Sequence, residues 1–254
     1  MSRLTKLLLI VVVIFAATIA CAVPFSPSVV SGSGDIIIVE RGVSDFKEIL
    51  VSGVGRVIVT QGETESLTIE TDDNLMEYIK TEVKGNTLEI GFTKDTSFSP
   101  GGGNKILEPT DGFIFRVSVV DLNAIAVSGA AKFEVKKLKT DQLAITLSGA
   151  GDITIDSLDA AKLDVLVSGA GNVDLTGKAE VQEIKLSGFG RYQADDLESQ
   201  EAVVTISGAG GAEVWVSETL DVTISGAGDV KYYGSPSVTP EISGVGRIQS
   251  LGEK

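Results

Sequence analysis

The chain is poor in the residues that most often carry catalysis or hold metal ions. It has no histidine and one cysteine, Cys21, in 254 residues. A Ser/His/Asp triad therefore lacks its base, and one thiol can form neither an intrachain disulfide nor a thiolate cluster. Acidic residues outnumber basic ones by 35 to 21, for a net charge of −14. This charge disfavours nucleic acid and anionic headgroups as partners, and we expect no cofactor.

What the chain has in abundance is a four-residue motif, Ser-Gly-x-Gly. Its copies begin at Ser52, Ser128, Ser148, Ser168, Ser187, Ser207, Ser225 and Ser243. From Ser128 onward the intervals are 20, 20, 19, 20, 18 and 18 residues. A nearly constant period is typical of a solenoid, in which one supersecondary unit stacks on copies of itself.

Each repeat reads as one coil made of two strands. An alternating apolar and polar run follows the motif, as in residues 152–155, and a second run precedes the next motif, as in residues 163–167. A polar turn such as residues 156–159 joins them, and no helical spacing occurs. We therefore predict an all-β fold, a right-handed parallel β-helix of roughly 18–20 residues per coil. Residues 126–254 would form the regular coils, after a more irregular β portion at 43–125.

The motif itself predicts the corner of each coil. We expect its glycines to adopt positive φ angles and to let neighbouring coils approach to about 4.8 Å. The third position holds Val, Ala or Phe, and we expect it to point inward as a small plug. The serine hydroxyl would hydrogen-bond along the stack or to turn amides. A serine nucleophile is disfavoured because the serines are all alike and no histidine is present. Ala131 departs from the motif by replacing its last glycine.

Calcium-binding β-rolls are the metal site that this repeat comes closest to. They need an aspartate in each repeat to supply oxygen ligands. Here Asp152 and Asp229 follow the motif, but Lys132, Asn172 and Arg191 take the same place in other copies. We therefore expect no metal site.

The first 21 residues are typical of an export signal. Arg3 and Lys6 precede an apolar stretch at residues 7–17. Residues 18–21, Thr-Ile-Ala-Cys, favour a lipoprotein leader in which Cys21 carries the lipid. A cleaved signal peptide and an uncleaved apolar anchor remain alternatives. In each case the protein is exported, and with the lipid or the anchor it stays on the membrane, in the periplasm or at the cell surface.

Between the leader and the coils the pattern is less regular. Residues 22–42 read as a tether, with Ser, Pro and Gly concentrated at 24–35. Residues 72–80 predict a short helix with Asp72 or Asp73 as its N-cap. We expect a loop over residues 97–112.

Three segments together resemble the head GIN domain of autotransporter adhesins. They are residues 46–62, the repeated Ser-Gly-Ala-Gly coils, and residues 230–236 before the last motif, so that the resemblance covers about residues 43–250. It implies a secreted or lipid-anchored β-helical protein of bacterial envelopes and no catalytic residues. We expect a non-catalytic adhesion or interaction module tethered to the cell envelope, with an envelope glycan or surface protein as partner.

Two alternatives to adhesion stay open. The first is a structural spacer, or an accessory protein of envelope assembly or stress response. The second is an enzyme that acts on polysaccharides, which is less favoured because no cluster of charged residues recurs to mark a cleft.

Two aromatic residues form the candidate contact surface. Alternation places Ala212 and Val214 inside, so Trp215 points outward, and Tyr233 holds the equivalent position one coil later. Adjacent exposed rings could form a stacking platform for a sugar or an apolar side chain. Alternatively, the rings shield the open edge of the C-terminal coils.

Overall fold

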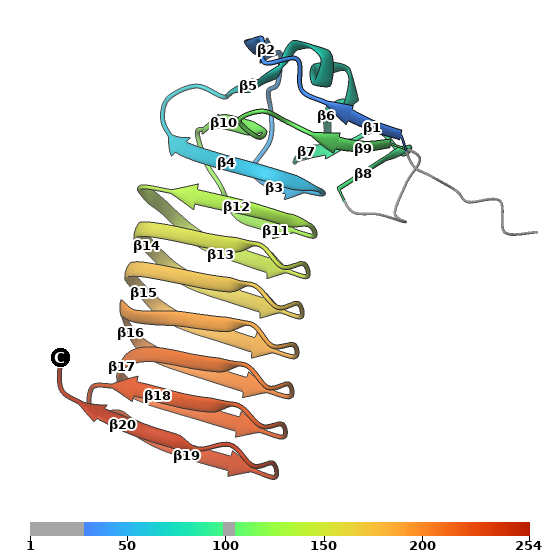
Figure 1. The fold of residues 1–254 in the computed structure, drawn as a ribbon. Helices are drawn as coiled ribbons and strands as arrows, with labels where there is room; N and C mark the ends of the chain where they lie inside the picture. The colour runs from blue at the N-terminus through green and yellow to red at the C-terminus, as the bar shows by residue number, and fades with distance from the viewer. Residues whose placement is uncertain (1–27, 99–104) are drawn as a thin grey trace, which may run out of the picture.

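The computed structural model describes residues 28–98 and 105–254, and it is a β-solenoid of about six turns capped at one end (Figure 1). The prediction of an all-β, parallel solenoid is confirmed.

The N-terminal part contains β1 (Ser28–Ser31), β2 (Ile36–Arg41), β3 (Glu48–Val51), β4 (Val54–Gln61), β5 (Ser66–Asp72), the 3₁₀ helix η1 (Asp73–Tyr78), β6 (Ile79–Lys84), β7 (Thr87–Phe92), β8 (Thr96–Ser97), β9 (Lys105–Glu108) and β10 (Ile114–Val119). The coils contain β11 (Ala124–Val127), β12 (Ala130–Val135), β13 (Leu138–Leu147), β14 (Asp152–Val167), β15 (Asn172–Leu186), β16 (Arg191–Ile206), β17 (Gly211–Ile224), β18 (Asp229–Tyr233), β19 (Ser237–Ile242) and β20 (Ile248–Gly252).

Alternation of apolar and polar residues builds the coils as expected. Ile153 and Ile155 are fully buried in β14, and Thr154 between them is partly exposed. Parallel pairing then sets each inward residue on its equivalent, so that Ile153 lies between Phe133 and Val173. The core is a set of such columns running along the solenoid axis.

The predicted polar turn within each coil is a bend in a continuous strand. In β14 the pairing with β15 continues past it, with only a register shift between Ile155 and Leu158. Gly177 lies opposite Leu158 and has φ +127°. Backbone pairing with the neighbouring coils holds this segment extended, so β14 to β17 each run around most of a coil.

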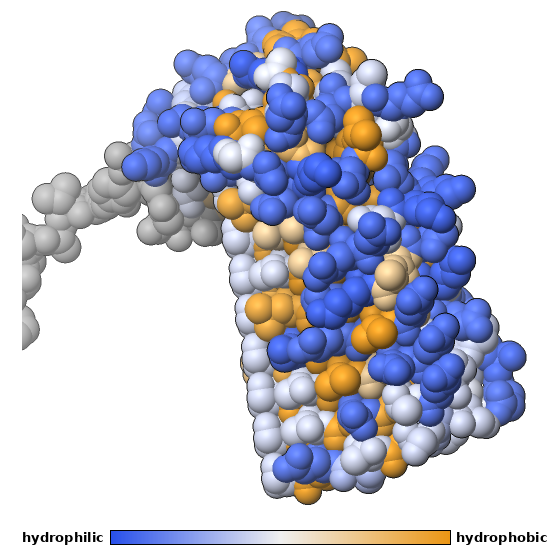
Figure 2. Space-filling view, turned by 180° about the vertical axis from the view of Figure 1, so that it is seen from behind, coloured by the Kyte–Doolittle hydropathy of each residue, from blue (hydrophilic) through white to orange (hydrophobic). Residues whose placement is uncertain are grey.

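The corners differ from the prediction in two respects. Among the motif glycines described, only Gly53 and Gly55 have positive φ. The third position points outward, with Phe189 79% and Val245 84% exposed, because the period of two continues through the corner and turns the fourth position inward. Figure 2 shows the corners as a nearly straight pale column along one edge of the stack. Ala131 is buried at the fourth position, where its register partner in the preceding coil is Gly55.

Close approach of the backbones explains the first glycine of the motif, which is its second residue. A Cβ atom on Gly169 would lie 1.8 Å from the carbonyl oxygen of Gly149, and one on Gly149 would lie 1.8 Å from that of Gly129. The next residue donates its backbone N–H to the same oxygen, as Ala170 does to Gly149 at 3.0 Å. We call this column of stacked glycines, each directly after its motif serine, the glycine ladder; it includes Gly129, Gly149, Gly169, Gly188, Gly208, Gly226 and Gly244.

The N-terminal part closes one end of the stack with antiparallel strands (Figure 1). Strand β10 pairs in parallel with β4 and antiparallel with β5, and β5 in turn pairs antiparallel with β2. Strands β1, β9 and β8 form a separate three-stranded parallel sheet.

Three predictions in this part are corrected. The described part of the expected tether holds β1 and β2, and the expected loop contains β9, because Ser28–Ser31 pairs with Lys105–Glu108. The short helix is the 3₁₀ helix η1, and its N-cap Asp72 makes no capping hydrogen bond. The Asp72 carboxylate instead accepts bonds from the N–H groups of Gly34 and Thr110, at 2.9 Å each, and from Thr110 Oγ1 at 2.7 Å.

Candidate binding site on strands β16 to β18

Trp215 and Tyr233 lie side by side, as the repeat predicts. They are register partners on β17 and β18. Ala212 and Val214 are buried, and Trp215 is half-buried on the outer side of the same strand. Tyr232 is also half-buried, so it is less enclosed than the inward position predicts.

A cationic side chain covers both rings. Lys254 Nζ lies 5.7 Å from the centroid of the Trp215 ring and 4.9 Å from that of Tyr233. Both distances are within the range of cation–π attraction, in which an ammonium group is drawn to the negative face of an aromatic ring. Two residues after β20, the chain therefore lies against the outer side of β17 and β18.

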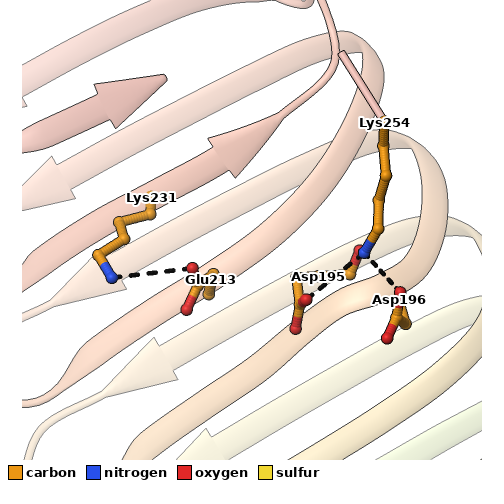
Figure 3. A network of polar contacts seen from close by, with 5 residues as sticks. All are labelled: Asp195, Asp196, Glu213, Lys231 and Lys254. Carbon is orange, nitrogen blue, oxygen red and sulfur yellow. Dashed lines mark hydrogen bonds and ion pairs between the residues drawn. The ribbon is translucent and has the colours of Figure 1, made fainter. Parts of the chain in front are cut away.

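Two carboxylates also contact the same ammonium group (Figure 3). Lys254 Nζ lies 2.5 Å from Asp196 Oδ1 and 3.4 Å from Asp195 Oδ2, and it also donates to the backbone oxygen of Asp195. The neighbouring pair Lys231 and Glu213, 3.8 Å apart, is separate from this contact. Trp215, Tyr233, Asp195 and Asp196 are called the ammonium site below.

The electrostatics of this region favour positive charge. Burial by itself lowers the pKa of Lys254, but the carboxylates of Asp196 and Asp195 outweigh it and leave that pKa raised. The pKa of Asp174 is raised by burial and by the nearby charges of Asp195, Asp156 and Asp196. Lys254 is therefore firmly protonated at neutral pH beside an excess of negative charge.

Sequence reasoning missed Lys254, Asp195 and Asp196, although one signal was present. The coil from Ser187 to Ser207 spans 20 residues and the next one spans 18. The extra length bulges out between Ala194 and Glu198, where β16 shifts register against β17. This bulge carries both aspartates to the surface beside Trp215.

The other candidate chemistries find little support among the described residues. The motif serines are all exposed. No group of three His, Cys, Asp or Glu in the described ranges could hold a metal ion. Asp229, one of the calcium-roll positions, pairs with Arg247 at 3.1 Å, and that contact lowers its pKa. Asp152 accepts a hydrogen bond from the Asn172 side chain at 2.8 Å.

The predicted leader lies outside the described residues, and Cys21 with it. Within residues 28–98 and 105–254, no helix is long and apolar enough to cross a membrane.

Fold and surface together define a β-solenoid protein that presents a small aromatic and acidic site near one end. Residues 45–236 match the family described as "Putative auto-transporter adhesin, head GIN domain". The chain belongs to this family. No curated protein matches it.

Solved structures show the same architecture. A "putative adhesin" from Bacteroides fragilis NCTC 9343 is 27% identical with a TM-score of 0.81, and the match covers 87% of this chain and 100% of that one. A "putative adhesin" from Parabacteroides distasonis ATCC 8503 is 24% identical with a TM-score of 0.70, over 88% and 100% of the two chains. A "Putative lipid binding protein" from the same organism is 20% identical with a TM-score of 0.65, over 88% and 100%. The last two matches show a shared fold alone.

Proposed function

We propose that this protein is a non-catalytic adhesion or interaction module held on the outer side of a bacterial membrane by a lipid on Cys21. The observation that carries the proposal is the position of the aromatic pair. Trp215 and Tyr233 lie near the end of the stack opposite to β1, where the chain enters the described body (Figure 1). An anchor before residue 28 would therefore hold the solenoid with this surface toward its surroundings.

The regular stacking also supports a role in presentation. Neighbouring coils are joined by continuous backbone pairing, and each coil contacts mainly its neighbours. Such a body is stiff along its axis and can carry a contact surface away from a membrane. An envelope glycan or a surface protein is the proposed partner. Family membership supports this role through the adhesin description.

Binding of the purified protein to bacterial envelopes tests the proposal. The experiment compares the wild-type chain with Trp215→Ala and Tyr233→Ala, with Phe189→Ala as a control for loss of an exposed aromatic ring elsewhere on the solenoid. We expect saturable binding that either site substitution weakens by about tenfold, at unchanged melting temperature. A spacer would show no saturable binding, and an enzyme would release glycan fragments. Either result would contradict the proposal.

A further inference from the structure

The ammonium site is built from three different coils. Asp195 and Asp196 come from β16, Trp215 from β17 and Tyr233 from β18. Their four side chains surround a single positive group, the ammonium of Lys254, whose side chain is 27% exposed. Rings and carboxylates converging on one ammonium are the arrangement by which proteins recognise organic cations.

The negative charge here exceeds what Lys254 can balance. Two further carboxylates lie nearby, because the charges of Asp195 and Asp196 act on Asp174, and so does the charge of Asp156. Neither has an ion-pair partner among the described residues. Asp195 and Asp196 thus share one ammonium group beside the further negative charge of Asp174, and the site would still attract a cation if Lys254 left it.

We propose that the ammonium site binds the alkylammonium group of an external ligand, and that Lys254 occupies it in cis until the ligand displaces it. This proposal rests on the contact role proposed above for Trp215 and Tyr233, and it names the chemical class of the ligand. A primary ammonium on an alkyl chain matches what the site already holds. Lysine side chains of a surface protein, polyamines and phosphatidylethanolamine headgroups all present that group.

The contacts of Lys254 are weak enough for displacement. Asp195 and Asp196 are 38% and 62% exposed, so their ion pairs are screened by water. Gly252, which ends β20, has φ +92°, and its carbonyl accepts a bond from the Gly234 N–H at 2.9 Å. After Gly252, the side chain of Glu253 accepts a hydrogen bond from the Ser235 hydroxyl. Lys254 can leave the rings while β20 stays in place.

A tethered group competes with free ligand at an effective concentration in the millimolar range. Removing the Lys254 ammonium should therefore strengthen ligand binding. The protein contains one tryptophan and four tyrosines, so fluorescence excited at the red edge, where tryptophan alone absorbs, reports on Trp215 in the ammonium site. The experiment titrates the full chain, in a mild detergent, with n-butylammonium at pH 7 and follows the fluorescence of Trp215.

We expect Lys254→Gln to respond at about tenfold lower n-butylammonium concentration than wild type. Adding Asp195→Asn and Asp196→Asn to Lys254→Gln should remove this gain. Lys231→Gln, which breaks the separate pair with Glu213, is the matched control and should titrate as wild type does. Uncharged n-butanol should give no saturable response. Thermal melts check that each variant is folded.

Three further titrations of folded Lys254→Gln distinguish the sources of the ligand: N-acetyl-lysine methylamide, spermidine, and phosphatidylcholine vesicles containing phosphatidylethanolamine. A response to any of them that depends on Asp195 and Asp196 supports the proposal. Failure of Lys254→Gln to bind n-butylammonium more tightly than wild type overturns it, and so does an equal response to n-butanol. Envelope binding is measured separately, so this site can fail while the proposed function stands, and the reverse.

Discussion

At the scale of single residues, the glycine ladder sets the spacing of the coils. Gly169→Ala would place a Cβ atom 1.8 Å from the Gly149 carbonyl oxygen and displace the bond from Ala170 N–H. We expect a loss of about 2–3 kcal/mol in the free energy of unfolding, measured by urea denaturation. Gly211→Ala is the control, because its Cβ would meet only Asp229 O, at 3.5 Å. Equal stability of the two variants would contradict the ladder.

Asp72 joins two distant segments of the cap, at Gly34 and Thr110. Burial alone raises the pKa of this carboxyl, but the bonds from Thr110 and Gly34 outweigh it and lower the pKa. The stabilisation is therefore present above the ordinary value of 3.8 and is lost as pH falls through the lower folded value. We expect Asp72→Asn to cost about 1–3 kcal/mol at pH 7 and less below pH 3.8, in urea titrations across that range. A cost that does not change with pH would contradict this role.

At the scale of elements, one buried polar pair crosses the core. Tyr192 Oη of β16 lies 2.5 Å from Gln182 Oε1 of β15, both fully buried among apolar columns. Tyr192→Phe leaves the Gln182 amide without that partner, and its Nε2 has none in the described part of the chain. We expect a loss of about 1–3 kcal/mol. Adding Gln182→Leu, the residue type of Leu163 at the register-equivalent position, should restore most of it. Additive losses in this double-mutant cycle would contradict the coupling.

The regular coils could be predicted because the alternation of apolar and polar residues and the repeat of the motif indicate the same structure. The period of two fixes which residues of β14 face inward, and the repeat stacks equivalent residues such as Ile153 and Val173. The prediction for the corner was half right. Its glycines let neighbouring coils approach closely, but most of them do not adopt positive φ angles. Strand β1 could not be predicted, because residues 28–31 become a strand only by pairing with residues 105–108. The aromatic pair followed from the repeat, but Lys254 reaches it through a tail outside the repeat.

At the scale of the whole molecule, a substitution of Cys21 tests how the body is attached. If Cys21 carries the lipid, Cys21→Ser should release the protein from the membrane or leave it as an unprocessed precursor, because the acyl chains supply the anchoring free energy. Membrane fractionation and apparent mass measure this outcome. Ala22→Ser is the control, which tests whether a polar side chain near the cleavage site is by itself enough to release the protein or to block its processing. Unchanged size and membrane yield for Cys21→Ser would favour an uncleaved apolar anchor.

Because the backbone pairing repeats from coil to coil, the number of coils sets the length of the molecule. Each coil adds one strand spacing, about 4.8 Å, between the capped end and the aromatic end, without altering either. Removal of residues 149–168, one full period between Ser148 and Ser168, would rejoin equivalent positions and shorten the reach by that single step. If the body is anchored as proposed, a lineage of such proteins can adjust its reach by gaining or losing whole coils, while the aromatic pair at the far end stays unchanged.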